Sequence, residues 1–335
     1  MPVRSPRIAS WGCAGALLAL LVGGCGAAGH GSAGPIAGTV VRTTVASGRV
    51  TPSVALHIAA RTTLPAPVQL PALAVAGGRV LAAGGLDAAD ASVADVVAVA
   101  PGRPRRVAQL PNAIHDAAAS ALGGPLLVFG GGSASGPTAA IEAVAHNGSV
   151  RAVGALPAPS SDLEAARVGG AVYVVGGFTG STPLRSILRY TPGQPLRQVA
   201  TLPHPLRYAA VAAVGGDVLI AGGTDGTHAR REILRFDPAH GVVQQIGSLP
   251  APLEHVAGAA LAGTFYVLGG RGDSLTSQQG AILAIDPRSG RLRRVGHLPL
   301  ALSDASAATL GARIWVVGGR DAAGRVHGEA WALRR

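Results

Sequence analysis

The sequence predicts an all-β protein: a six-bladed β-propeller with four antiparallel strands in each blade. Three observations predict this fold. A Leu-Pro pair recurs six times, a Gly-Gly pair that ends an apolar run recurs with the same spacing, and a spare strand precedes the first repeat. Repeats of this length that contain only strand signals are typical of propeller blades. The six repeats and the spare strand place the propeller at residues 54–335.

The two repeated pairs keep the same register along the chain. Leu-Pro begins at positions 64, 110, 156, 202, 249 and 298, so the steps are 46, 46, 46, 47 and 49 residues. Gly-Gly begins at 84, 130, 176, 222, 269 and 318, with identical steps. Two independent markers in register predict six copies of one structural unit.

Each unit carries the signals of four strands. Small residues follow Leu-Pro, and a Gly-Gly turn at 77–78, 123–124, 169–170 or 215–216 leads into the apolar run before the second Gly-Gly. Gly-Gly between two apolar runs predicts a two-residue type I′ hairpin, whose central residues both need a positive φ. After a variable loop comes a third strand, as at 187–190 and 233–236, and a fourth strand ends at the next Leu-Pro.

The two ends of the repeat array predict how the ring closes. The last unit stops at EAWALRR, which is its third strand, so its fourth strand is missing. The spare strand VALHIAARTT at 54–63 would supply the fourth strand and remove two free sheet edges. We therefore expect an N-terminal strand to close the propeller.

The repeat resembles the kelch motif over roughly residues 54–335. The resemblance rests on the strand followed by Gly-Gly, on an aromatic residue in two of the third strands, and on the Asp-Pro or Thr-Pro turns after them. Kelch repeats usually carry a tryptophan in the fourth strand, and these fourth strands, such as LRQVATLP, have none. The resemblance implies a kelch-type propeller, and it transfers no particular function.

The N-terminus has the features of an export signal. Arg4 and Arg7 precede the apolar stretch WGCAGALLALLVGG, and Val22–Cys25 resembles a bacterial lipobox, which implies lipid attachment at Cys25. We interpret residues 1–24 as a lipoprotein signal peptide and 25–53 as a flexible tether. The predicted location is the extracytoplasmic face of the cell membrane. An ordinary cleaved signal peptide with an incidental cysteine is the alternative.

Composition narrows the possible partners. The 335 residues are 48% hydrophobic and 13% charged, with a net charge of +11, and all the basic residues are arginine. Aromatic residues make up only 3%, so platforms for stacking nucleic-acid bases are scarce and no nucleic-acid partner is expected. The arginines are spread along the chain, which favours a role in solubility over one binding patch. We expect a monomer.

Polar residues line up in two adjacent columns just before the first strand of each unit, where the entering loops form one rim of the central channel. The first column reads Gln69, His115, Ser161, Arg207, Glu254 and Ser303. The second reads Leu70, Asp116, Asp162, Tyr208, His255 and Asp304. Only Leu70 is apolar, and the following strands are rich in alanine. The sequence therefore predicts a polar ring around the channel mouth as the ligand site.

The ring suggests several chemical roles. Arg207 would grip a carboxylate or phosphate, the histidines would act as acid or base near neutral pH, and the carboxylates would accept sugar hydroxyls. A polar rim that simply meets water is the alternative. No cofactor and no metal are expected, although His115 and His255 could converge from different blades. The tripeptide Arg271-Gly272-Asp273 is interpreted as a turn.

These features favour a membrane-anchored module that binds a protein or glycan ligand on the polar rim. Binding of a membrane surface or a cell-wall polymer through the arginines is one alternative. The other is a carbohydrate-active enzyme of the epimerase or mutarotase type. Some exported bacterial six-bladed kelch proteins are sialic-acid epimerases, and this chain is similar to them in blade number and export. Such an enzyme would use Glu254 or His255 as a base and Arg207 to hold a carboxylate.

Overall fold

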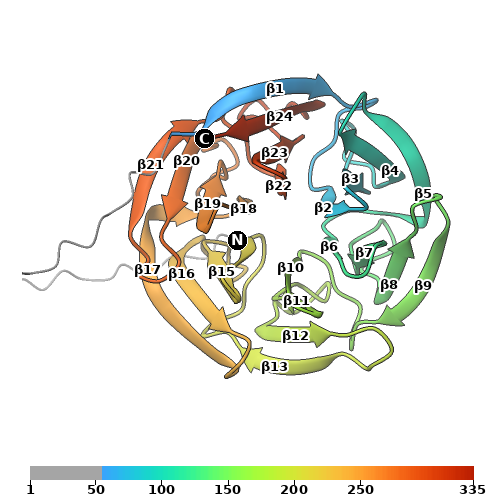
Figure 1. Cartoon of the computed structure of the whole chain (residues 1–335), viewed down its shortest axis with the longest axis horizontal. Helices are drawn as coiled ribbons and strands as arrows, with labels where there is room; N and C mark the ends of the chain where they lie inside the picture. The colour runs from blue at the N-terminus through green and yellow to red at the C-terminus, as the bar shows by residue number, and fades with distance from the viewer. Residues whose placement is uncertain (1–54) are drawn as a thin grey trace, which may run out of the picture. The chain divides into compact units, whose positions relative to one another are not determined.

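The computed structural model describes residues 55–335, and these residues form a closed ring of six blades (Figure 1). The signal peptide, Cys25 and the tether predicted from the sequence lie outside the described residues. In the described part, every named element is a strand, and no helix is long and apolar enough to cross a membrane.

Each blade is a four-stranded antiparallel sheet. Blades one to three are β2 (Ala72–Ala76), β3 (Arg79–Ala83), β4 (Val93–Ala100) and β5 (Arg105–Ile114); β6 (Ala118–Ala121), β7 (Leu126–Phe129), β8 (Ala140–Val144) and β9 (Val150–Ala155); and β10 (Glu164–Val168), β11 (Ala171–Val175), β12 (Ser186–Tyr190) and β13 (Arg197–Thr201). Blades four and five are β14 (Ala210–Val214), β15 (Asp217–Ala221), β16 (Arg230–Asp237) and β17 (Val242–Leu253); and β18 (Ala257–Leu261), β19 (Thr264–Leu268), β20 (Ala281–Ile285) and β21 (Leu292–His297).

The sixth blade combines the two ends of the propeller. It contains β22 (Ser306–Leu310), β23 (Arg313–Val317) and β24 (Glu329–Arg334), and its outer strand is β1 (His57–Thr63), which pairs antiparallel with β24. The predicted closure by an N-terminal strand is confirmed. Because all six blades and their cores are complete within residues 55–335, this part of the chain contains what it needs to fold by itself.

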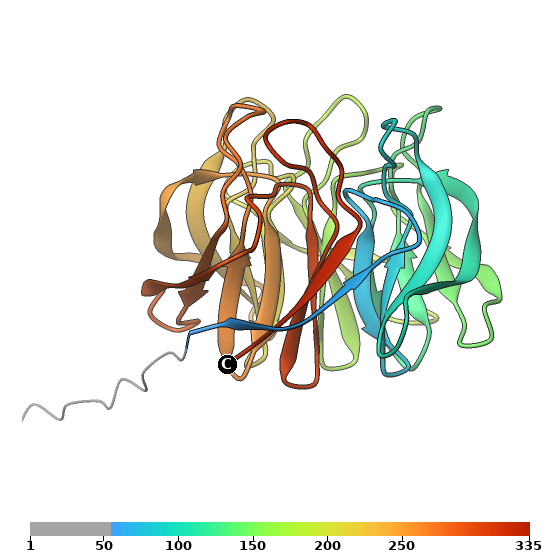
Figure 2. The ribbon, with the colours of Figure 1, turned by 90° about the horizontal axis from the view of Figure 1, so that it is seen from above.

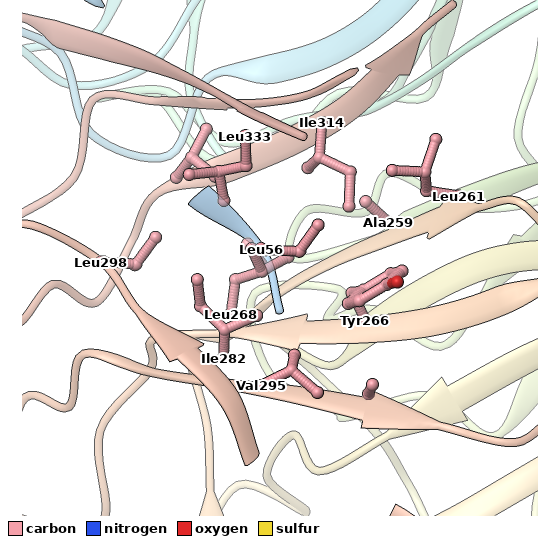
Figure 3. Close-up of a cluster of buried hydrophobic side chains, with 13 residues drawn as sticks. Leu56, Ala259, Leu261, Tyr266, Leu268, Ile282, Val295, Leu298, Ile314 and Leu333 are labelled. Atoms are coloured by element: carbon pink, nitrogen blue, oxygen red, sulfur yellow. The ribbon is translucent and has the colours of Figure 1, made fainter. Parts of the chain in front are cut away.

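The hydrophobic core lies between neighbouring blades. The second strand of each blade is apolar and almost fully buried, as in β11, and it packs against the sheets on both sides. In one such cluster, Tyr266 and Ile282 of blade five meet Ile314 and Leu333 of blade six around Leu56 (Figure 3). Leu56 therefore joins the closing strand to the core of two blades.

The repeated Gly-Gly pairs hold adjacent blades together. The N–H of the second glycine of each pair donates to a carbonyl in the segment that leads into the first strand of the next blade, as Gly85 does to Ile114 at 2.8 Å and Gly319 does to Val68 at 2.9 Å across the closure. The first glycine has a positive φ, and a Cβ on Gly84 would lie 2.5 Å from the Ile114 carbonyl oxygen. Glycine is required here because the blades approach too closely for a side chain.

The hairpins between first and second strands are less uniform than the sequence predicted. The turns at Gly77-Gly78 and Gly215-Gly216 have positive φ at both residues, as expected. Gly170 lies outside that region. At Gly123-Gly124 the prediction of a two-residue turn is wrong, because Ala121 pairs with Leu126 and four residues connect the strands. Pro125, which cannot donate a strand hydrogen bond, follows the glycines and lengthens the connection.

The propeller has two distinct faces (Figure 2). The mouth face carries the two polar columns and the six loops between second and third strands. The turn face carries the hairpins between first and second strands, the turns between third and fourth strands, and the C-terminal residue. The first strands run from the mouth face to the turn face, so the loops and the short turns are separated by the full height of the ring.

We expect Leu56→Ala to lower the free energy of unfolding by about 2–4 kcal/mol, because the change leaves a cavity in the core between blades five and six. Leu56 is only 5% exposed. The matched control is Ile58→Ala, two residues away and 51% exposed, which should change stability by less than about 0.5 kcal/mol. Urea unfolding of both variants measures this, and equal losses would contradict the role given to Leu56.

Candidate functional site

The second polar column forms a collar around the channel mouth. The collar consists of Leu70, Asp116, Asp162, Tyr208, His255 and Asp304, one residue from each blade. All six are in the left-handed region, with φ between 51° and 60°. Side chains other than glycine are uncommon there, and aspartate is among those that tolerate it best. The shared conformation brings all six residues to one small cavity on the axis.

Backbone hydrogen bonds link the collar from blade to blade. The N–H of Asp162 donates to the carbonyl of Asp116 at 2.8 Å, and the N–H of Asp116 donates to Leu70 at 3.3 Å. The series continues from Leu70 to Asp304 at 2.7 Å and from Asp304 to His255 at 3.1 Å. These four bonds join five of the six collar residues in a second series of inter-blade contacts.

The collar nearly closes the channel. The cavity that it surrounds has a volume of about 40 Å³. Since one water needs about 10–15 Å³ of such space, the cavity holds a few waters and not a sugar ring. Below it, the alanine-rich middles of the six first strands line a wider space of about 260 Å³. A ligand larger than water that reaches the collar from the mouth face must therefore rest above it.

Arg207 is already engaged by its own protein. Its guanidinium pairs with Asp162, whose side chain is 3% exposed, and it lies 4.1 Å from the centroid of the Phe178 ring. It also donates to the Tyr208 hydroxyl at 3.4 Å. Burial would lower the pKa of Arg207, but the nearby Asp162 and Tyr208 together raise it. A ligand carboxylate at this position would compete with Asp162.

His255 and Asp304 form a second internal pair. His255 Nδ1 hydrogen-bonds Asp304, the Ser303 hydroxyl donates to the other oxygen of the same carboxyl, and the Tyr208 ring stacks on His255 with centroids 3.7 Å apart. Burial alone would raise the pKa of Asp304, but the hydrogen bonds and charge of His255 and the bond from Ser303 lower it. His255 is thus held on both its edge and its face.

The pKa of Asp116 is shifted in the opposite direction to that of Asp304. Its side chain is 6% exposed, and burial followed by the charges of Asp162 and Asp304 raises its pKa well above the usual range. The Tyr208 hydroxyl, 3.4 Å away, is its hydrogen-bond donor. Burial also raises the pKa of Tyr208, which keeps that hydroxyl protonated. Beside it, burial lowers the pKa of His115 against the opposing charge of Asp162. Both changes favour neutral groups at this part of the mouth.

The first polar column supports the mouth loops and does not line the cavity. Its residues form isolated β-bridges with the residue after each Gly-Gly, such as His115 with Gly132 and Ser161 with Phe178. Several of their side chains then contact a loop residue: Gln69 donates to Asp90 at 2.7 Å, His115 hydrogen-bonds Ser92 at 2.8 Å, Glu254 pairs with Arg271, and Ser303 accepts from Gln278 at 3.3 Å. The two columns, adjacent in sequence, have different tasks.

The Arg-Gly-Asp tripeptide is absorbed into this loop structure. Arg271 is buried against Glu254, and Asp273 accepts a hydrogen bond from the N–H of Ala229 in the neighbouring loop at 2.6 Å. These contacts leave neither charged group of the tripeptide free within the described residues. The two histidines proposed as convergent do not share a metal site, and residues 55–335 contain no group of three or more His, Cys, Asp or Glu able to hold an ion.

Glu164 is a site residue that the sequence analysis missed. It begins β10, two residues beyond Asp162, and it lines the small cavity that the collar surrounds. It is partly exposed to the channel, but six strands enclose it, and this removal from bulk water raises its pKa to about 8. The signal was visible in the sequence, because it is the only acidic residue in any of the six first strands.

Comparisons with known proteins agree with this architecture. The family model described as "Kelch motif" matches residues 159–194, which include the first three strands of blade three. The fold is a six-bladed kelch-type β-propeller. A solved structure titled "Structure of YjhT" aligns with a TM-score of 0.67 and 14% identity, covering 82% of this chain and 99% of that one. At this identity the likeness shows the fold alone. No curated protein matches the sequence.

We expect Arg207→Ala to lower the free energy of unfolding by about 3 kcal/mol, because it leaves the buried Asp162 carboxylate without its partner. Thermal and urea unfolding measure the loss. Arg231→Ala, an exposed arginine of the same blade, is the control and should change stability by less than about 0.5 kcal/mol. Equal stability of both variants would show that the Arg207–Asp162 pair does not support the collar.

We expect stability to fall as pH rises between about 4.5 and about 8, because Glu164 keeps its proton in the folded protein and loses it in the unfolded chain. The folded pKa of about 8 lies above the ordinary value of 4.5, so the folded protein binds more protons in this window. The stabilising contribution is complete below the lower value and is lost as pH passes the upper one. Glu164→Gln should reduce this slope in urea unfolding measured at several pH values, and Asp116, whose pKa is also raised, accounts for part of the remainder; an unchanged slope would contradict the assignment.

Proposed function

We propose that this protein is a membrane-anchored, extracytoplasmic binding module whose mouth face holds a protein or glycan ligand. The anchor would be lipid on Cys25, which lies outside the described residues. The observation that carries the proposal is the closed, internally paired collar. It offers a floor with little free binding capacity, so recognition falls to the loops that stand around it.

The mouth loops suit this role because they differ from blade to blade, and the loops of blades two to five adjoin one another to form a wall. A Cβ on Gly180 would meet Pro137 of the preceding loop at 3.3 Å, and one on Gly226 would meet Pro183 at 3.0 Å. The bond from Ala229 to Asp273 extends the wall to the next blade. Variable loops on a rigid scaffold are the usual place for recognition.

The loop between β19 and β20 carries the most exposed apolar side chain on this wall. Its Leu275 is 75% exposed, the highest value among the large hydrophobic residues of the described chain. Thr227 in the neighbouring loop is also exposed. An apolar tip beside polar side chains fits a protein surface or the apolar face of a sugar ring.

A carbohydrate-active enzyme is the second candidate, and Glu164 is the observation that favours it. Glu164, with a pKa near 8, lines the same cavity as Asp116, whose pKa is also raised, and the two carboxyls could exchange protons near neutral pH. The residues first considered for this role are less suited to it, since Glu254 pairs with Arg271 and His255 pairs with Asp304.

We expect the propeller to retain one glycan class on an array, or one protein after crosslinking at the cell surface, through its loops. Leu275→Asp and Thr227→Arg should each weaken retention at least tenfold. Val242→Asp is the control, because Val242 is 54% exposed on an outer strand away from the mouth. Equal losses in the mouth variants and in the control would contradict the proposal.

The same experiment separates the two candidates. Isotope exchange from solvent into a retained sugar, followed by NMR and abolished by Glu164→Gln with binding intact, would establish the enzyme. Retention without exchange supports the binding module. Retention that is lost with Glu164→Gln and unaffected by the loop variants would place the ligand at the collar and overturn the loop assignment.

A further inference from the structure

The fold gathers arginines that the sequence spreads out. The turns between third and fourth strands lie on the turn face, and each of several blades places arginine there, in the turn or at the start of the fourth strand. Exposed residues of this kind are Arg103, Arg105, Arg197, Arg288 and Arg291. Each blade has the same order of strands and turns. Residues at equivalent positions, about 46 or more apart in sequence, therefore lie on the same face of the propeller.

The inner part of the same face adds further positive charge. Arg167 lies next to the last residue of β10, at the lower end of the channel, and Arg313 begins β23. Arg334 ends β24, where it is paired in register with His57 of the closing strand. All three arginines are exposed. The positive surface therefore extends from the outer turns to the channel exit.

Acidic residues are distributed in the opposite way. Of the 17 acidic residues in the chain, the turn face carries Asp217, Asp237 and Asp286. Each of these three is engaged locally, by Arg235 at 3.9 Å, by His240 at 2.6 Å, or by Ser289 of its own turn at 2.8 Å. They do not neutralise the exposed arginines of the neighbouring blades.

The two faces also differ in how their arginines are used. On the mouth face, Arg230, Arg271 and Arg320 each form an ion pair with an acidic side chain. On the turn face, none of the exposed arginines named above has a carboxylate within salt-bridge distance among residues 55–335. A group of unpaired guanidinium groups on one face is arranged to meet an external anion.

The path of the chain shows which anionic surface this face would meet. Leu56 donates to the Val295 carbonyl of blade five at 3.1 Å, and His57 lies beside Arg334. The described chain thus enters the propeller at the turn face, where His57 lies in register with Arg334 (Figure 2). A propeller held at Cys25, as proposed above, would hang from this face, and the arginines would be the groups closest to the lipid headgroups.

We propose that the turn face docks on an anionic membrane surface, with the mouth face directed away from it. Anionic headgroups attract arginines that lie within about a Debye length of the surface, and each contributes roughly a fivefold gain in binding. The arginines would hold the propeller in one orientation, which attachment at Cys25 alone would not do. The loops would then face outward to their ligand.

The test uses residues 55–335, which lack Cys25, so its result does not depend on the lipid anchor or on the mouth ligand. Binding is measured by co-sedimentation with phosphatidylcholine vesicles and with mixed phosphatidylcholine–phosphatidylglycerol vesicles. We expect binding to the mixed vesicles only, and loss of that binding when salt rises from about 0.1 M to about 1 M, where the Debye length falls from about 10 Å to about 3 Å.

Charge-matched variants locate the surface. Arg288→Gln, Arg291→Gln and Arg313→Gln combined should weaken binding to the mixed vesicles at least tenfold. Arg61→Gln, Arg231→Gln and Arg325→Gln combined remove the same charge elsewhere and should change binding less than threefold. Equal losses in the two variants would show that binding depends on the net charge of the propeller and not on the turn face. Equal binding to both kinds of vesicle would show that binding does not depend on the charge of the headgroups. Either outcome overturns the proposal.

A soluble polyanion is the remaining occupant to exclude. Double-stranded DNA is offered as a competitor at physiological salt. The proposal is supported if the vesicles retain the propeller in its presence. It is overturned if DNA binds through the same three arginines while the vesicles do not. Circular dichroism of both triple variants checks that any loss reflects binding and not folding.

Discussion

Six strands that pack side by side around one axis are the constraint on which the rest of this propeller depends. Neighbouring first strands are in contact all around the ring, so little room remains for side chains near the axis. Strands such as β14 and β18 consist almost entirely of alanine, valine, glycine and leucine for this reason. The same crowding forces glycine where the second strand meets the next blade, and it gives each blade one short connection into the channel, where the collar forms.

Two rings of inter-blade hydrogen bonds follow from this arrangement. The Gly-Gly amides form one ring, and the collar backbone forms most of the other, with Tyr208 as the exception whose carbonyl accepts from Val256 at 3.4 Å. Because the collar side chains are satisfied mainly by one another, the floor of the mouth is rigid, and its charges are balanced locally. Ligand binding at the floor would require a group that displaces a carboxylate from Arg207 or His255.

The fold was largely predictable from the sequence, and the chemistry of the site was not. Gly-Gly and Leu-Pro mark local backbone geometry, so six blades and the closing strand could be predicted from spacing alone. The turn at Gly123-Gly124 differs because a proline next to the turn changes the strand pairing. The partners of Arg207 and Glu254 depend on which loop lies opposite each column in space, and no local pattern contains that information. Glu164 was visible as a lone acid in an apolar strand, but its meaning depends on enclosure by six strands.

The repeat also explains how arginines that are not clustered in the sequence form a basic patch on the turn face. A period near 46 residues returns each structural position to the same face, so arginines at this turn in several blades come to one face. Acidic residues accumulate in the collar and the mouth loops by the same route, where they pair with the arginines found there. The propeller thereby separates a mouth face, where arginines pair with carboxylates, from a turn face whose exposed arginines are unpaired. The described chain enters the propeller at that turn face. If the turn face docks on a membrane as proposed above, the mouth face is the one left free for a ligand.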